Sequence, residues 1–69
     1  MIEFELEDRE FIELNNLLKV TGLCESGGRA KVVIAEGDVR VNGIVELRKR
    51  CKIRSGNEVE YMGEKIEVI

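Results

Sequence analysis

The dipeptide Asn42-Gly43 constrains the fold of this chain more than any other feature, because it lies between two apolar segments in VRVNGIVE. Asn-Gly is the preferred pair for a two-residue type I′ turn, in which both central residues need a positive φ. The pattern therefore predicts a β-hairpin in which Val41 faces Ile44. The register at such a turn also determines which of the following side chains share a face of the sheet.

A run of basic residues follows this hairpin and does not fit its register. VELRKRCKIR, residues 45–54, has five basic side chains among its last seven positions. If residues 47–54 are extended, the basic side chains at even positions face one way, about 6.6 Å apart, because a strand rises about 3.3 Å per residue. The apolar side chains that face the other way are Leu47, Cys51 and Ile53. Continued from the turn, however, the hairpin register would place Arg48 and Arg50 on the apolar face. We therefore expect a bulge or a loop between Val45 and Arg48.

The N-terminal third of the chain predicts one strand and one helix. IEFELE, residues 2–7, alternates strictly between apolar and acidic side chains, which is the period of a strand with one buried and one wet face. Asp8 then offers an N-cap for a helix over residues 11–20, which Gly22 can end in a left-handed conformation. The apolar residues at helical spacing are Phe11, Leu14, Leu17 and Leu18.

A second helix is predicted to begin after Ser26, whose hydroxyl can cap SGGRAKVVIAEG, and to end at Gly37. Its inward stripe consists of Ala30, Val33 and Ile34. Only three or four residues are expected between the helices. The two helices should pack as a tight pair, because short helices do not persist alone in water.

The C-terminal residues EVEYMGEKIEVI predict another hairpin, around Gly63. The complete order is an N-terminal strand, two packed short helices and a small, mostly antiparallel sheet, which is an α+β fold. Sixty-nine residues without proline or a linker-like segment indicate one domain over residues 1–69.

Charge is distributed unevenly along the chain. The net charge is −3, yet residues 29–54 carry eight basic and three acidic side chains. Screening over about 8–10 Å allows one positive face to coexist with acidic ones. Exposed ion pairs with Glu46, Glu58 or Glu60 would contribute only about 0–1 kcal/mol each, so stability gives no reason to gather so many cations. The middle of the chain is therefore the candidate surface for an anionic partner.

The chain has no histidine, and its two cysteines, Cys24 and Cys51, form no CxxC pattern. The usual Cys/His metal sites and nucleophile–histidine pairs are excluded, so we expect no enzyme activity, no metal and no cofactor. We interpret the cysteines as small, partly buried hydrophobic residues rather than a disulfide. An alternative is redox sensing by Cys51, with a thiol pKa lowered by the basic neighbours Lys49, Arg50 and Lys52.

The chain contains no apolar run near the roughly 20 residues that a membrane-spanning helix needs. Its N-terminus, MIEFELEDRE, is acidic and alternating, the reverse of a signal peptide. We therefore expect a cytoplasmic protein that has no membrane partner.

Two glycine-containing corners have a structural and a functional interpretation. At Ser26-Gly27-Gly28, a Gly-rich helix start can expose N–H groups for phosphate, or the glycines can let two helices approach closely. At Asn42-Gly43, turn formation explains the pair better than contact with a ligand.

A set of residues between positions 14 and 61 resembles the S4 RNA-binding domain, also called the alpha-L motif. The set comprises Leu17-Leu18, Gly22, Ser26, Ala30, Lys31, Ile34, the segment GDVRVNG (residues 37–43) and the later SGNEV (residues 55–59). The small, free-standing bacterial type is the most similar, because it shares ESG before the second helix, AK within it, IAEG at its end and the run RKRCKI.

The resemblance implies that the paired helices and the strand segment after them form one RNA-facing surface. Ser26 matches the capping serine of the family, and Lys31 matches a basic residue on its second helix. The arginine that often follows the serine is Gly27 here. Arg29 is two positions later, about 200° around a helix, so its equivalence to the family arginine is left open.

We therefore expect a non-enzymatic protein that binds structured RNA, either ribosomal or transfer RNA, through phosphate and shape contacts, with the ribosome as a further potential partner. Three aromatic residues are too few for a base-stacking sheet, and no small-molecule substrate is expected. The alternative is a protein-interaction module that docks an acidic or a ribosomal protein. The candidate RNA-binding residues are Ser26, Arg29, Lys31, Arg40, Asn42, Arg48, Lys49, Arg50, Lys52 and Arg54.

Overall fold

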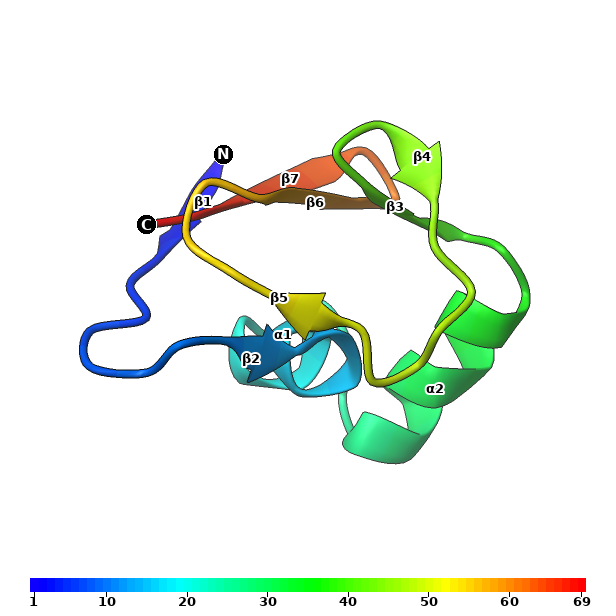
Figure 1. Ribbon diagram of the computed structural model, residues 1–69. Coiled ribbons are helices and arrows are strands. Elements are labelled where there is room, and N and C mark those ends of the chain that lie inside the picture. Colours follow the sequence, from blue (N-terminus) through cyan, green and yellow to red (C-terminus); the bar gives the residue numbers. More distant parts are fainter.

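The computed structural model describes residues 1–69, which form an α+β arrangement of short strands around two helices. In chain order the elements are β1 (Ile2–Phe4), β2 (Ile12–Glu13), α1 (Leu14–Val20), α2 (Gly27–Ala35), β3 (Val39–Val41), β4 (Ile44–Val45), β5 (Lys52–Ile53), β6 (Glu58–Tyr61) and β7 (Glu64–Val68). Figure 1 shows the main sheet on one side of the molecule and the helices on the other, with β2 and β5 paired beside the helices. The predicted fold class is confirmed.

Five strands form the main sheet in the order β1-β7-β6-β3-β4. β1 runs parallel to β7, and the other three pairs are antiparallel. Both predicted hairpins are present. Asn42 and Gly43 turn with φ values of 53° and 83°, and Met62 and Gly63 with 51° and 78°. Both turns therefore have the two positive φ angles that a type I′ turn requires.

Helix α1 begins at Leu14, so the predicted start at residue 11 is wrong. Ile12 and Glu13 are extended and pair with β5, where Ile12 lies opposite Ile53. This strand pair satisfies the backbone groups of residues 12–13 and buries both isoleucines, which a helical turn starting at residue 11 would not do.

Three further expectations for this region have different outcomes. Asp8 lies well before the helix and is not its N-cap, which is Glu13. Phe11 therefore does not belong to the apolar stripe of α1, whereas Leu14, Leu17 and Leu18 are fully buried as expected. The predicted end of the helix is also correct, because Gly22 follows the C-cap with a φ of 82°.

Helix α2 agrees with its prediction. The hydroxyl of Ser26 accepts a hydrogen bond from the amide of Arg29 at 3.0 Å, which is N-cap geometry. Gly37 follows the helix with a φ of 85°. The connection between α1 and α2 spans residues 21–26, which is longer than predicted, and the amide of Cys24 within it donates to the carbonyl of Leu18 at 3.0 Å.

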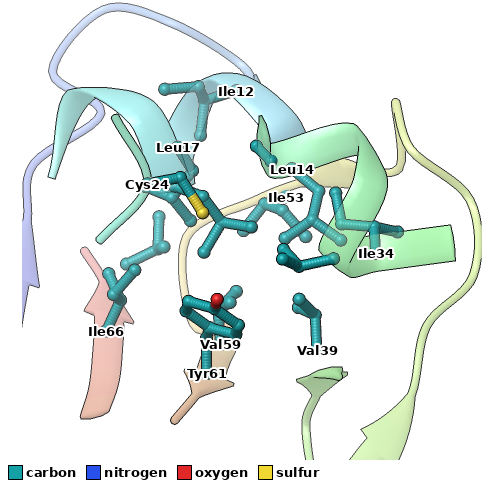
Figure 2. Close-up of a cluster of buried hydrophobic side chains, with 14 of the residues drawn as sticks. Ile12, Leu14, Leu17, Cys24, Ile34, Val39, Ile53, Val59, Tyr61 and Ile66 are labelled. Carbon is teal, nitrogen blue, oxygen red and sulfur yellow. The ribbon is translucent and has the colours of Figure 1, made fainter. Parts of the chain in front are cut away.

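The buried side chains form one hydrophobic cluster between the helices and the main sheet. Figure 2 shows Val39, Val59 and Tyr61 of the sheet facing the helical layer, with Ile53 of β5 between them and α1. Ile53 is fully buried, so β5 connects the basic part of the chain directly to the core. Neither α1 nor α2 has the length and apolarity of a membrane-spanning helix.

Candidate functional site

The basic loop, residues 46–51, leaves β4 at the edge of the main sheet and enters β5 beside α1 (Figure 1). The predicted break in register is therefore present, as a loop that turns at residues 49–50. The expected alternation of faces holds for residues 51–54, which are in turn partly buried, exposed, buried and exposed. It is wrong for Leu47, which is 59% exposed, because the backbone is not a strand there.

Backbone carbonyls of the basic loop bind the start of α1. The amide of Leu14 donates to the carbonyl of Cys51 at 2.9 Å, and the amide of Asn15 donates to the carbonyl of Lys49 at 3.1 Å. A helix start leaves such N–H groups without intrahelical partners, and the side chain of Glu13 does not cap them. The basic loop therefore caps α1 with its backbone and leaves its charged side chains exposed.

Glu46 determines the geometry of the first half of the basic loop. Its carboxylate accepts hydrogen bonds from the Arg48 amide at 2.9 Å, from Nε at 2.9 Å and from Nη2 at 3.0 Å. These bonds hold the pKa of Glu46 at about 2, below its usual 4.5, and raise the pKa of Arg48. Arg48 is thus already paired with a carboxylate.

Of the three glutamates that could have offset the basic run, only Glu46 forms an ion pair with it. Glu58 pairs with Lys65 of β7 at 3.9 Å, and Glu60 lies opposite Arg40 in the main sheet. The remaining basic side chains of the loop, of β5 and of the residue after β5 form no ion pair. They are Lys49, Arg50, Lys52 and Arg54.

Cys51 lies beside this carboxylate, with Sγ 3.6 Å from Oε1 of Glu46 and 3.5 Å from Nη2 of Arg48. Burial raises the pKa of the Cys51 thiol, and the charge of Glu46 raises it further. The expectation of a lowered pKa, which the redox-sensing alternative requires, is wrong, because burial and the charge of Glu46 together outweigh the opposing charge of Arg48. The redox-sensing alternative loses its physical basis, since a protonated thiol is a poor nucleophile. Cys24 is buried in the core, as expected.

The basic loop and the start of β5 line a hollow of about 530 Å³ that is open to solvent. Its lining residues are Arg48, Arg50, Cys51 and Lys52. Three of these four side chains are cations, and no carboxylate lines the hollow. Such a site suits an anion with several acceptor oxygens, of which a phosphate group is the common biological example.

Phe11 adjoins this surface, although the sequence had placed it in a helix. Nζ of Lys52 lies 5.0 Å from the centre of the Phe11 ring, and Cζ of Arg54 lies 5.7 Å from it. Both distances are within the range of cation–π contact. Ile12 and Leu14 are buried and Phe11 and Glu13 are only partly buried, which is strand period, but FIEL does not show this period in sequence because Phe11 is as apolar as Ile12.

The candidate residues of α2 do not form one group. Arg29 and Lys31 are two positions apart, about 200° around the helix, so they project from different flanks. A side chain at Gly27 would meet nothing within 4 Å, and one at Gly28 would meet only Oγ of Ser26 at 3.8 Å. Close packing between the helices therefore does not require these glycines.

Arg40 and Asn42 belong to the β3–β4 hairpin, which the basic loop follows and to which it is joined by the bond from the Glu46 amide to the carbonyl of Val39 at 3.0 Å. Nη1 of Arg40 donates to the carbonyl of Gly43 at 3.4 Å. Oδ1 of Asn42 accepts from the amide of Glu58 at 2.9 Å, and the amide of Asn42 donates to the carbonyl of Glu58 at 2.7 Å. Asn42 thus stabilises the turn and joins it to β6, in agreement with the structural interpretation of this pair.

A helix pair followed by the main sheet, with a basic loop that runs from β4 of this sheet to β5 of the two-stranded sheet, is the arrangement expected for the resemblance noted in the sequence. The family model of the S4 domain matches residues 4–69, and the chain belongs to the S4 domain family.

Particular relatives narrow this classification. YbcJ of Escherichia coli (strain K12), which is named for RNA binding, is 48% identical over 69 residues, covering 100% of this chain and 99% of YbcJ. The solution structure of YbcJ matches with a TM-score of 0.77, covers 100% of this chain and 87% of that chain, and is described as having an alpha-L motif involved in RNA binding. RlbA of Bacillus subtilis (strain 168), named for ribosome maturation, is 38% identical over 56 residues, or 81% of this chain and 79% of RlbA.

Proposed function

We propose that this protein binds structured RNA without catalysing a reaction, and that the basic loop and β5 form the contact surface. One observation carries the proposal. Four exposed cations without a carboxylate partner surround or adjoin a hollow that has no acidic lining; they are Lys49, Arg50, Lys52 and Arg54. Membership of the S4 domain family and the name of YbcJ support RNA as the anionic partner.

The proposal extends to the type of RNA and the place of binding. We propose ribosomal or transfer RNA, met in the cytoplasm and in contact with the ribosome, which is supported by the naming of RlbA for ribosome maturation. Recognition depends mainly on phosphates and RNA shape, because cations outnumber aromatic side chains on this surface. Arg29 and Lys31 on α2, and Arg40 on the hairpin, are auxiliary contacts in this proposal.

The salt dependence of RNA affinity tests the proposal. If the four unpaired cations each neutralise one phosphate, log K falls with log salt at a slope of about −3 to −4. The double variant Arg50→Glu/Lys52→Glu should weaken binding and reduce the magnitude of the slope by about 2.

A matched control changes the net charge by the same amount away from the loop. Lys19→Glu/Lys65→Glu alters one residue on α1 and one on β7 and should leave the slope nearly unchanged. Equal weakening by both double variants would show that only net charge matters. Persistence of a captured partner after RNase treatment would favour the protein-docking alternative.

A further inference from the structure

Phe11 differs from the other aromatic residues in what covers its ring. Tyr61 is buried in the core, and Phe4 packs against the core as a partly buried residue with one cation over its ring, Cζ of Arg9 at 5.3 Å from the ring centre. Phe11 is also partly buried, yet it is not among the residues that pack against the core. Two cations lie over its ring, at 5.0 Å and 5.7 Å from its centre. Phe11 is therefore the aromatic residue with two exposed basic side chains over its ring and no place in the core cluster.

The pairing of β2 with β5 explains this position. Ile12 lies opposite Ile53 and Glu13 opposite Lys52, so continuation of the register places Phe11 opposite Arg54. The two isoleucines face the core, and their neighbours therefore face outward together. Lys52 faces Glu13 in this register but forms no ion pair with it, and its ammonium group lies over the Phe11 ring instead.

We propose that Phe11 is the stacking position for one unpaired nucleobase, flanked by Lys52 and Arg54 as contacts for the adjacent phosphates; this inference rests on the proposed RNA-binding function. Lys52 is shared between the ring and the hollow of about 530 Å³, so a base on Phe11 has a cationic hollow next to it for its phosphate. On binding, the two cations move from the ring to the phosphates and the ring face becomes free for the base.

A stacking position on Phe11 requires an unpaired nucleotide in the RNA, whereas a basic surface alone requires only phosphates. A fully paired RNA helix keeps its bases stacked inside and offers only phosphates and groove edges, whereas a bulge or a loop can place a base on an aromatic ring. The protein should therefore prefer structured RNA with an unpaired nucleotide next to the helix. Stacking of one base on an aromatic ring corresponds to about a 5- to 150-fold gain in affinity.

The test uses the full chain and two RNA hairpins that differ only in one bulged nucleotide, with 2-aminopurine at the bulge. We expect the wild type to bind the bulged hairpin more tightly and to change the 2-aminopurine fluorescence. Phe11→Leu should lose about 5- to 150-fold in affinity for the bulged hairpin, with an unchanged salt slope and little effect on the paired hairpin. Phe11→Trp should restore binding. Circular dichroism melts of each variant confirm that it is folded.

Other outcomes overturn the inference. If Phe11→Leu makes the salt slope shallower for both hairpins, Phe11 only positions the two cations and does not stack a base. If Phe11→Leu binds both hairpins as the wild type does, the ring has no role, while the proposed RNA binding stands. If the wild type binds neither hairpin, the proposed function fails together with the inference.

Discussion

The amide of Asn15 donates a hydrogen bond to the carbonyl of Lys49 at 3.1 Å, and this contact joins the first helix to the basic loop. Together with the bond from Leu14 to Cys51, it caps α1 with the backbone of the segment whose side chains form the candidate RNA surface. Side-chain direction follows from this arrangement, because carbonyls that face the helix leave the charged groups on the solvent side. The stability of the fold and the shape of the site are therefore coupled.

Glu46→Ala is expected to weaken RNA binding although it removes a negative charge from the surface. Loss of the three bonds to Arg48 frees the basic loop, and ordering each long side chain again on binding costs about 0.5–1.5 kcal/mol, or about 2- to 10-fold in affinity. Fluorescence anisotropy with a labelled RNA hairpin measures the change. Glu36→Ala, at the exposed end of α2, removes a carboxylate outside the loop and should bind equally or slightly more tightly. Tighter binding by both variants would show that charge alone decides.

The order of the basic loop is expected to depend on pH through Glu46. Its pKa in the folded protein is about 2, below the usual 4.5, so its contribution to stability is complete above pH 4.5 and is lost as the pH falls towards 2. The amide NMR signal of Arg48 should titrate with a midpoint near pH 2. Glu46→Gln should abolish that titration while leaving the other carboxylates unchanged. A midpoint near 4.5 would mean that the carboxylate is free in solution.

Ile53 is expected to determine how firmly the basic loop is held. It is fully buried opposite Ile12, so Ile53→Val should lower the free energy of unfolding by about 0.5–1.5 kcal/mol, and Ile53→Ala by about 2–5 kcal/mol. Urea denaturation measures both changes. In Ile53→Val, hydrogen exchange at the Asn15 amide should also accelerate, because β5 anchors the loop that accepts its bond. Val32→Ala, at a residue 45% exposed on α2, is the control and should change stability by less than about 0.5 kcal/mol. An unchanged exchange rate at the Asn15 amide would show that the order of the basic loop does not depend on the packing of Ile53.

Much of this fold could be predicted from sequence because local rules decide it. Asn42-Gly43 requires two positive φ angles, Ser26 caps the helix that follows it, and Gly22 ends the helix before it. The start of α1 could not be predicted in the same way. It depends on pairing between Ile12 and Ile53, which are far apart in the chain and belong to strands of only two residues. Such short strands give too little periodicity to compete with the helical spacing of the neighbouring leucines.

The sequence was enough to predict which charged residues form the candidate site, but not how their side chains are arranged. The register conflict correctly indicated a loop before Arg48, and the five cations of residues 48–54 are all exposed. The bond between Glu46 and Arg48 was not foreseen in this form, because it links residues two apart within an irregular loop and not across a sheet. Phe11 was missed for the reason that α1 was extended too far towards the N-terminus.

Glu67→Lys is expected to stabilise the protein. Glu67 of β7 lies directly opposite Glu3 of β1 on one side and Glu58 of β6 on the other, so three carboxylates share one row of the sheet. Like charges in opposed positions are destabilising, and their replacement by an opposite charge is worth about 0.2–1 kcal/mol per pair. Thermal and urea denaturation at low salt should show the gain, and high salt should reduce it. Glu64→Lys is the control, since Glu64 on the same strand lies opposite Tyr61 and should gain less. Equal stabilisation by the two variants would show that repulsion among the three carboxylates is not the cause of the gain.

The proposed function requires that the basic loop contacts RNA. An NMR titration of the isotope-labelled full chain with a structured RNA hairpin tests this requirement most directly. We predict that amide shifts concentrate at residues 47–54 and at Phe11. The signals of Ile2, Glu3 and Phe4 should stay in place, because β1 is at the opposite edge of the main sheet from β4, where the basic loop begins. Shifts confined to the main sheet, or unchanged signals throughout the basic loop at saturating RNA, would contradict the proposed surface.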